Sequence, residues 1–547
     1  MLHGDILGER ASLSPSKTAL ICVTGQRLTY RDLNQRAIQC AKLFLDYCRL
    51  KKSDRVAILA KNHIEFLDAF FAAGKSGVIL VPLNVRQTAP ELSAILKSSG
   101  AKAIIYDDEL TDRIQQLKQD PVLAEQIATW ITLDSPTQEL APNDSPSNHA
   151  DPGYNKLRAT YSTAWSSPLC DPEDIYCLLY TSGTTGKPKG VMIPHRMVAW
   201  NACNTAINWQ LCGSDVSSVF TPLYHAGGLF AFLTPILAAG GTIVLHREFD
   251  AGEVWRTVER EKCTVMLGVP TIYKMLLEAP EFAQVNLVHV RWFISGGAPL
   301  SIELVDAYHQ RGVILKQGYG LTEVGVNCFS MSEEDALRKA GSIGRPMMFT
   351  EAKLVGAEGN PILPEEKEDS QPKENLAENA QQGELCLRGP HVSKGYWLDP
   401  AATAAVLDEN GWFHTGDIAR RDPEGFFYIV GRSKDMFISG GVNVYPAEIE
   451  AELLRHPAIG DAAIIGVPHP TWGEVGVAFL VLKPVPVTNA NPSPDDLTAY
   501  LSPKLAKYKL PKEFLFVESL PRTAYGKVLK SELQAKYAIR EHFVHRH

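Results

Sequence analysis

The sequence lacks the features that mark several classes of protein. Its 547 residues include ten cysteines, but none stands at C-x-x-C spacing from another or beside histidines at zinc-finger distances. The N-terminus has no apolar stretch of the kind that a secretory signal needs. No internal repeat is visible. These absences exclude a disulfide scaffold and a zinc-finger protein, and they predict reduced, buried thiols in a cytoplasmic protein.

An excess of charge of one sign is also missing. The chain carries 54 Lys and Arg residues against 62 Asp and Glu residues, which gives a formal net charge of −8. Because nucleic-acid binding favours a basic surface, this mild acidity argues against a nucleic-acid partner. The length predicts about three to five domain-sized units, at roughly 100–200 residues each.

One apolar stretch has the length of a membrane span. Residues 226–245 form an uncharged run of about twenty residues, enough to cross a bilayer. Glycines and a proline interrupt it, however, and its Gly-Gly pair followed by TIVL is typical of a buried helix, a turn and a strand. We therefore expect no transmembrane helix, while peripheral membrane contact and a homodimer stay open.

Strand-like and helical patterns alternate through the first half of the chain. RVAILAK, VILVPLN and AKAIIYD are typical of strands, and HIEFLDAFFAAGKSG and APELSAILKSSG are typical of helices between them. Such alternation predicts parallel sheets joined by crossover helices. The fold class is therefore α/β, with a large N-terminal domain of layered sheets. Residues 134–174 are polar and aperiodic, and they are expected to form a loop.

The pattern changes near residue 434. Pro446 suits the first position of a helix over residues 447–454, and strand-like AAIIGV and VGVAFLVL follow. These elements predict a small, mobile α+β domain of about 110 residues. The expected domains are residues 1–433 and 434–547. The last part of the small domain is basic, which fits either a solvated face or a surface that meets a polyanion.

A donor-rich loop follows a buried strand. The apolar run IYCLLY leads into TSGTTGKPKG, whose backbone N–H groups, hydroxyls and lysines can surround phosphate oxygens. It is not a Walker A loop, because Gly183 is followed five residues later by Pro188 rather than by the required Gly-Lys pair. The expected phosphate-binding residues are Thr181, Ser182, Gly183, Thr184, Thr185, Gly186, Lys187 and Lys189.

This loop is the first of five motifs that stand in a fixed order. QGYGLTE ends at Glu323, GWFHTGD at Asp417, GRSKDMFISGGVNVYPAEIE at Glu450 and PRTAYGKVLKSEL at Leu533. Together they resemble the adenylate-forming superfamily, which contains acyl-CoA synthetases, adenylation domains and luciferases. The resemblance spans essentially the whole chain. Within the superfamily, the sequence most resembles bacterial fatty-acyl-CoA and aryl-acyl-CoA ligases.

The resemblance implies a ligand for each nucleotide-facing motif. Glu323 would help to hold the magnesium of Mg-ATP, and Thr322 and Thr184 would offer hydroxyls to phosphate or metal. Asp417 would accept hydrogen bonds from the ribose, and Arg432 would donate to ribose or phosphate. Adenine and the acyl pocket would be lined by Tyr319, Gly320, Gly296, Gly297, Ala298 and Pro299.

The resemblance also implies roles for residues that act at successive steps of the reaction. Lys527 would stabilise the charge that gathers on the α-phosphate during carboxylate attack. Lys434 would lie at the pivot on which the small domain swings. Gly440 and Gly441 would then face the pantetheine arm of CoA. His225, in PLYHAGGL, either orients the carboxylate, closes the pocket or is a structural histidine.

The predicted activity is an ATP-dependent carboxylate–CoA ligase. The acid would first give an acyl-adenylate and pyrophosphate, and the CoA thiol would then displace AMP, with ATP, Mg²⁺ and CoA as the reactants and cofactor. No side chain becomes acylated. Fatty acids are the first choice of substrate, and aryl acids of the 4-coumarate kind are the second. An adenylation enzyme that loads a carrier protein, or a non-catalytic nucleotide-binding relative, would share most of these motifs.

Overall fold

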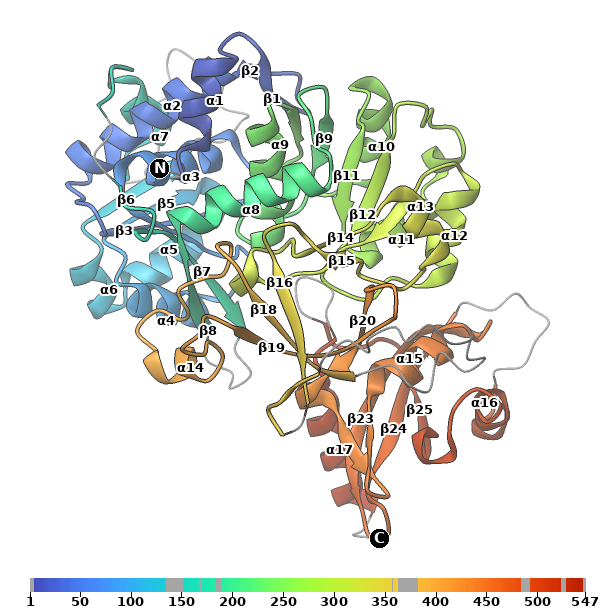
Figure 1. The fold of residues 1–547 in the computed structure, drawn as a ribbon. Helices are drawn as coiled ribbons and strands as arrows, with labels where there is room; N and C mark the ends of the chain where they lie inside the picture. Colours follow the sequence, from blue (N-terminus) through green and yellow to red (C-terminus); the bar gives the residue numbers. More distant parts are fainter. Residues whose placement is uncertain are drawn as a thin grey trace.

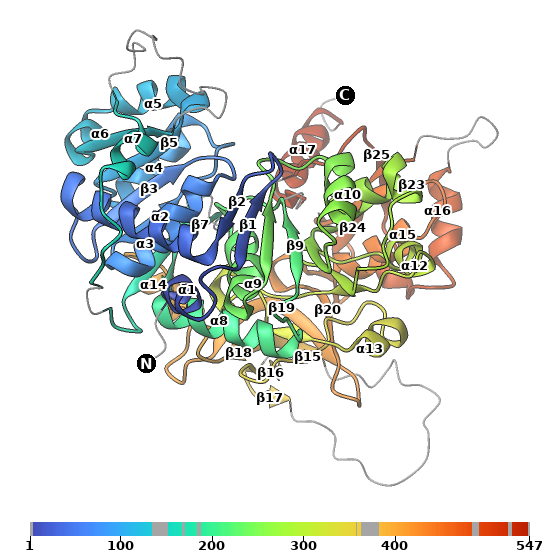
Figure 2. The same cartoon turned by 90° about the horizontal axis from the view of Figure 1, so that it is seen from above.

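The computed structural model describes residues 4–133, 151–166, 170–182, 188–356, 358–362, 382–483, 492–522 and 528–544. The larger, N-terminal part contains two mainly parallel sheets and an antiparallel one, and the C-terminal part folds around a further sheet (Figure 1). Seen from above, the units built on the two parallel sheets lie side by side (Figure 2). The predicted α/β class, with a large and a small part, is confirmed.

The first sheet follows the predicted alternation of strand and helix. Its strands are β3 (Arg55–Leu59), β4 (Ile79–Pro82), β5 (Ala103–Asp107), β6 (Thr129–Leu133), β7 (Ile175–Ser182) and β8 (Pro188–Pro194). Its helices are α2 (Tyr30–Lys42), α3 (Ile64–Ser76), α4 (Ala89–Ser99), α5 (Thr111–Lys118) and α6 (Pro121–Gln126). The strand order is β6-β5-β3-β4-β7-β8, all parallel except β8, which pairs antiparallel with β7 as a hairpin. A capping box between Thr29 and Asp32 starts α2, and left-handed Gly77 ends α3.

The second sheet contains the parallel strands whose carboxyl ends lead into the candidate site. Its strands are β1 (Thr18–Cys22), β2 (Arg27–Thr29), β9 (Val216–Val219), β10 (Thr242–Leu245), β11 (Val265–Gly268), β12 (Trp292–Ser295) and β13 (Leu315–Gln317). Its helices are α1 (Ile6–Leu13), the π-helix η3 (Gly227–Leu233), α9 (Thr234–Ala239), α10 (Ala251–Arg260), α11 (Pro270–Glu278) and α12 (Ile302–Gln310). The order is β13-β12-β11-β9-β10-β1-β2, and only β2 is antiparallel.

The apolar run at residues 226–245 is part of this second unit. It forms η3, α9 and β10, with left-handed Gly240 at the turn, as the glycine pattern predicts. Leu229, Leu233 and Ile236 are fully buried in the core. Within the described ranges, no helix combines the length and the apolarity that crossing a bilayer requires.

A third sheet and one long helix tie these units together. Helix α8 (His195–Asn208) leads from the first sheet into the second (Figure 1). The third sheet has the order β17-β16-β18-β19-β20, and β14 pairs with β15 beside it. The bounds are β14 (Phe329–Ser330), β15 (Arg345–Pro346), β16 (Glu351–Val355), β17 (Pro361–Ile362), β18 (Gln382–Arg388), β19 (Phe413–Arg421), β20 (Phe427–Arg432), α13 (Glu333–Arg338) and α14 (Pro400–Ala404).

The C-terminal part forms its own sheet and core. Its elements are β21 (Phe437–Ser439), β22 (Val442–Val444), α15 (Pro446–Leu454), β23 (Ile459–His469), β24 (Gly473–Leu482), α16 (Pro494–Leu501), β25 (Glu513–Phe516) and α17 (Lys530–Val544). Phe437, Ile449 and Leu480 belong to its buried cluster. The short 3₁₀ turn η6 (Ser433–Asp435) connects β20 to β21, and α15 packs against β20.

Two expectations about local structure need correction. The segment 134–174, expected to be a loop, contains helix α7 (Tyr154–Ala159). This short helix forms because Tyr154 is fully buried and its hydroxyl donates to Asp68 at 3.2 Å. All ten cysteines are free, as expected, but Cys212 is exposed because it lies in the turn after α8.

Candidate active site

The carboxyl ends of the parallel strands bring separate motifs to one edge of the second sheet. Strands β9, β11, β12 and β13 run in the same direction, so the segments that follow them emerge together. Residues 296–299 follow β12, and residues 318–320 follow β13. Gly318 donates its N–H to the Ser295 carbonyl at 2.7 Å, which joins the two segments directly.

Gln317 fixes the backbone around residues 296–299. Its side-chain carbonyl accepts the N–H of Leu300 at 2.9 Å, and its amide donates to the Ala298 carbonyl at 3.3 Å. A side chain built on Gly296 would meet nothing within 4 Å. The backbone of this segment is therefore open on the side where a flat ligand could approach, as the resemblance implied for Gly296, Gly297, Ala298 and Pro299.

Asp417 is the centre of a compact polar group. It lies on β19 directly opposite Arg432 of β20. Arg432 Nε lies 2.7 Å from Asp417 Oδ1, and the hydroxyl of Tyr319 donates to Asp417 Oδ2 at 2.6 Å. The residue is only 3% exposed. Each carboxylate oxygen has a second lone pair, so Asp417 can still accept hydrogen bonds from two sugar hydroxyls.

Tyr319 is held in its donor form. Burial raises the pKa of Tyr319 well above its usual range, and the neighbouring Asp417 carboxylate raises it further. Its ring meets Phe329 edge to face, with the ring centroids 5.6 Å apart. Gly320 comes next, and a Cβ there would lie 2.1 Å from the carbonyl oxygen of Val326. Only glycine fits at this position, which fixes the turn that carries the following Thr322 and Glu323.

Glu323 is a largely enclosed carboxylate that accepts hydrogen bonds from its own backbone N–H and from Tyr396. It lies in the 3₁₀ turn η5 (Thr322–Val324), and the hydroxyl of Tyr396 donates to its Oε1 at 3.0 Å. The Nζ of Lys189 stands 5.0 Å from the centre of the Tyr396 ring. The contact places the end of the β7–β8 hairpin beside Glu323. Sequence reasoning missed Tyr396 because no motif contains it.

The electrostatics of Glu323 fit a divalent cation. Burial raises the pKa of the Glu323 carboxyl above its ordinary value, whereas its own backbone N–H, the Tyr396 hydroxyl and the charge of Arg432 act to lower it. An enclosed carboxylate whose hydrogen-bond donors are neutral lacks full charge compensation. An oxygen-preferring cation such as Mg²⁺ would supply that compensation. The donor set is therefore suited to the magnesium that accompanies ATP.

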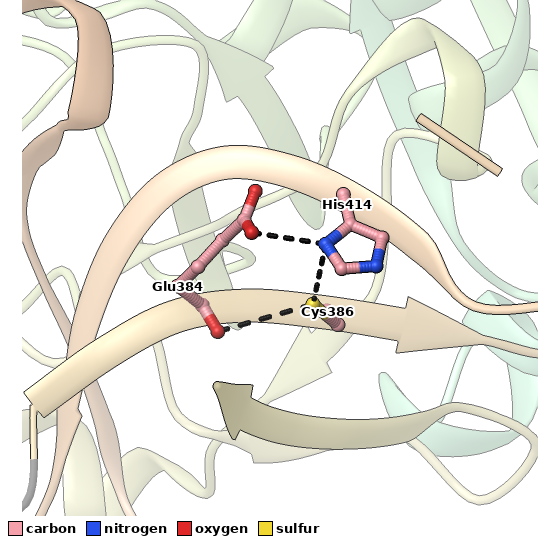
Figure 3. A group of neighbouring side chains, drawn as sticks. All are labelled: Glu384, Cys386 and His414. Carbon is pink, nitrogen blue, oxygen red and sulfur yellow. Dashed lines mark hydrogen bonds and ion pairs between the residues drawn. The ribbon is translucent and has the colours of Figure 1, made fainter. Parts of the chain in front are cut away.

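A second missed group supports the backbone next to Asp417. Glu384, Cys386 and His414 meet across β18 and β19 (Figure 3). His414 Nδ1 lies 2.9 Å from Glu384 Oε2 and 3.4 Å from Cys386 Sγ, and Glu384 Oε1 accepts the N–H of Gly416 at 3.0 Å. Burial, with the Glu384 charge as a smaller cause, raises the pKa of the Cys386 thiol to about 12. Glu384 thus anchors the residue that precedes Asp417.

His225 belongs to the same edge of the second sheet. It lies in the segment between β9 and η3, and its ring is 4.7 Å from that of Tyr224. Burial lowers the pKa of His225 to about 3, with the charge of Arg86 as a smaller cause. The imidazole is therefore neutral near pH 7, so it can orient or shield a substrate but brings no positive charge.

The predicted residues of the small part lie on its surface. Lys434 is exposed in η6. Gly440 and Gly441, with φ of 59° and 82°, form the two-residue turn between β21 and β22. The Gly440 N–H donates to the Trp472 carbonyl at 2.9 Å. This two-residue geometry needs positive φ at both positions, which explains the glycine pair.

Several predicted site residues lie outside the described residues. Of the phosphate loop, the structure places Thr181 and Lys189 opposite each other at the end of the β7–β8 hairpin, with the backbone of Ser182 beside them. Gly183, Thr184, Thr185, Gly186 and Lys187 lie outside the described ranges, as does Lys527. Arg522 and Val528, which flank the segment of Lys527, pair in an antiparallel bridge.

Comparison with models of known protein families identifies the family of this chain. The model described as AMP-binding enzyme matches residues 7–397, and the one described as AMP-binding enzyme C-terminal domain matches residues 448–527. The chain belongs to the AMP-binding enzyme family. The resemblance predicted from the five motifs is thereby confirmed.

Known relatives of this AMP-binding enzyme act on different acids. A feruloyl-CoA synthase of Amycolatopsis is 38% identical over 96% of the chain and 97% of its own length. A long-chain-fatty-acid–CoA ligase of Mycobacterium tuberculosis is 35% identical over 98% of both chains. The o-succinylbenzoate CoA synthetase of Bacillus subtilis, solved with its acyl-adenylate intermediate, has a TM-score of 0.79 at 30% identity, over 97% of this chain and 98% of its own. The protein is an acid–thiol ligase, and ligases of this family use ATP, Mg²⁺ and CoA.

Proposed function

We propose that this AMP-binding enzyme joins a carboxylic acid with an apolar body to CoA, with fatty acids as the first candidate substrates. The observation that carries the nucleotide half of the proposal is the Asp417 group, in which Tyr319 and Arg432 hold a buried carboxylate beside Glu323. Aryl acids are the second candidate. A relative of each kind supports the two candidates: the fatty-acid ligase is 35% identical to this chain, and the feruloyl-CoA synthase is 38% identical.

The first step is attack of the substrate carboxylate on the α-phosphate of ATP. In this proposal Asp417 and Arg432 bind the ribose, and the hydroxyls and lysines of residues 181–189 bind the phosphates. Tyr319 and residues 296–299 flank the adenine and the acid. Glu323, with Thr184 and Thr322, would hold Mg²⁺, which when bound neutralises part of the triphosphate charge. Positioning and charge neutralisation then suffice for an in-line displacement that releases pyrophosphate.

The second step needs a different surface of the small domain. We propose the domain boundary at residues 433/434, within the turn that connects β20 to β21. Lys527 serves the first step, and the turn at Gly440 and Gly441 lines the approach of CoA in the second. Both cannot occupy one active site at once, so rotation near Lys434 separates the steps. The CoA thiol then attacks the acyl carbonyl and AMP leaves.

Two other functions would use many of the same residues. An enzyme that loads a carrier protein would share the first step, but the relatives named above are CoA enzymes, which favours free CoA. A non-catalytic relative would not need Glu323, Asp417, Arg432 and Lys527 together. Cytoplasmic location, homodimer formation and peripheral contact with membranes stay predictions.

The proposal is tested by pyrophosphate release over a panel of acids, followed by detection of the thioester. The panel should pair fatty acids of increasing length with cinnamic and benzoic acids, each with free CoA. We expect thioester formation with one of the two classes and little with the other. Pyrophosphate release without any thioester from free CoA would favour a carrier-protein acceptor, and no release with any acid would contradict the ligase assignment.

A further inference from the structure

A cavity of about 410 Å³ lies away from the motifs described above. It opens where the start of β12 and strand β13 of the second sheet meet β14, β15, α13 and the turn between β19 and β20 (Figure 1). Its volume is within the range of about 300–1,000 Å³ that small-molecule sites have. Among the residues that the structure describes, none that belongs to the five motifs lines this cavity.

Lys316 is the buried charge of this cavity. It is 9% exposed, lies on β13, and is adjacent in sequence to Gln317. Successive residues of a strand face opposite sides. Gln317 contacts residues 298–300, so Lys316 points away from the nucleotide-facing segment and lines the cavity.

The surroundings of Lys316 do not neutralise it. Its Nζ lies 4.7 Å from the centre of the Trp292 ring and 3.5 Å from the Met331 carbonyl oxygen, a long contact. Among the described residues, no carboxylate forms an ion pair with it. Burial lowers the pKa of Lys316 to about 8, against the opposite effect of Glu333 and with a smaller lowering by Arg291. An ammonium group buried without an anion is unfavourable, and a bound anion would relieve it.

The other charges around the cavity leave a positive excess. Arg291 is matched by Asp215, at 2.9 Å from both carboxylate oxygens, and Asp335 is matched by Arg338 at 2.7 Å. Arg345 lies over the Phe426 ring at 4.2 Å and donates to the backbone carbonyl of Glu424. Two positive side chains of the lining, Lys316 and Arg345, are therefore left with one acid, Glu333. The net charge of these three groups is +1, which a ligand with a single negative charge would balance.

The walls of the cavity include three aromatic side chains. Trp209 and Trp292 line the cavity with their ring centroids 5.9 Å apart at an interplanar angle of 82°. Phe426 closes another side. Trp209, Trp292 and Phe426 are 6%, 2% and 0% exposed, so an apolar group in the cavity would contact only small parts of their rings.

We propose that this cavity, called here the Lys316 cavity, binds a small organic carboxylate, with the carboxylate against Lys316 and Arg345 and the apolar body against Trp209 and Trp292. The site is distinct from the place where the acid substrate reacts. It lies on the opposite face of β13 from residues 298–300. The protein thus carries a second carboxylate site beside the strand that leads into Tyr319.

The test is the binding of para-fluorobenzoate, followed by fluorine NMR without ATP or CoA. Wild-type protein is expected to bind one more molecule than the Lys316→Met variant. The matched control Lys274→Met, which removes an exposed lysine of α11, should bind like the wild type. Lys316→Arg should restore binding because it keeps the charge. Equal stoichiometry in wild type and Lys316→Met would overturn the proposal.

A pH series on the wild type tests the same point without any variant. Above a pH of about 8 the amine loses its charge, so the affinity of the second site should fall by up to about tenfold between pH 7 and pH 9. The charged groups that face Lys316 are Arg291, Glu333, Asp335 and Arg345. A pH-independent second site would contradict the assignment. Inorganic phosphate should not displace the probe, and displacement at equal concentration would show that charge alone is recognised.

Discussion

The two surfaces that serve the two proposed half-reactions differ in how they are built. Asp417 is 3% exposed, and Arg432 and Tyr319 occupy both of its oxygens. Around the turn at Gly440 and Gly441, by contrast, Ile438, Val442 and Trp472 are 47%, 42% and 47% exposed. Exposed apolar side chains that gather at one place are typical of a surface that meets a partner. We therefore expect the proposed nucleotide site to be formed before its ligand binds, and the proposed thiol site to be completed only when the small domain docks.

Among the substitutions considered, Lys527→Ala should change the rate of one half-reaction relative to the other by the largest factor. Its charge is needed only while the α-phosphate is attacked, so adenylation should fall by roughly 10²–10³-fold or more. Thioester formation from preformed acyl-adenylate should persist. The two half-reactions are measured separately by pyrophosphate release and by thioester formation from synthetic acyl-adenylate. Equal loss of both would contradict the role given to Lys527.

The next effect is expected from Lys434→Pro. Proline fixes φ near −65° and removes one N–H, so it restricts the pivot without touching a ligand. Adenylation should stay substantial and most thioester production should be lost. Lys507→Pro, at another exposed lysine of the small part, is the control for a general effect of proline. Both half-reactions at wild-type rates in Lys434→Pro would place the pivot elsewhere.

A smaller effect is expected from Asp417→Asn. Weakening a charged hydrogen bond of about 1.5–3 kcal/mol should raise the KM for ATP by roughly ten- to a hundredfold. The KM for CoA should stay near that of the wild type, since the thiol site lies on the small domain. Asp306→Asn, an exposed acid on α12, is the matched control. An unchanged KM for ATP would show that Asp417 does not hold the ribose.

The smallest effect is a shift in pH dependence in Tyr396→Phe. The Tyr396 hydroxyl acts to lower the pKa of Glu323, which burial raises, so its removal should raise that pKa further. In the proposed role Glu323 binds Mg²⁺ only when it is ionised, so the adenylation rate should fall when it is protonated. The acid limb of the rate profile should therefore move to higher pH, while Tyr47→Phe, at an exposed tyrosine, leaves it in place. A limb that moves to lower pH would contradict the role of this contact.

The elements of the fold follow from local patterns, while parts of the site do not. The helix at residues 447–454 and the strand after the Gly-Gly pair could be predicted, because each depends on a few neighbouring residues. Helix α7 could not, since burial of Tyr154 against Asp68 decides it. Long-range packing of this kind is not visible in a window of sequence.

The candidate site shows the same division. Tyr319, Asp417 and Arg432 stand in separate motifs, and the structure brings them within hydrogen-bonding distance of one another. Tyr396 and Glu384 lie outside the five motifs, because only loop placement brings Tyr396 to Glu323 and only strand pairing brings Glu384 to His414. Lys316 is a further case, since its burial depends on three elements that are distant in sequence.

One measurement tests the two-step account most directly. Enzyme, ATP, Mg²⁺ and the preferred acid are mixed and quenched rapidly without CoA, and CoA is added to a second sample after the first step is complete. The account predicts about one pyrophosphate and one bound acyl-adenylate per enzyme before CoA, with AMP and thioester released only after it is added. Pyrophosphate that appears only once CoA is present would contradict a nucleotide site built in advance of the thiol site.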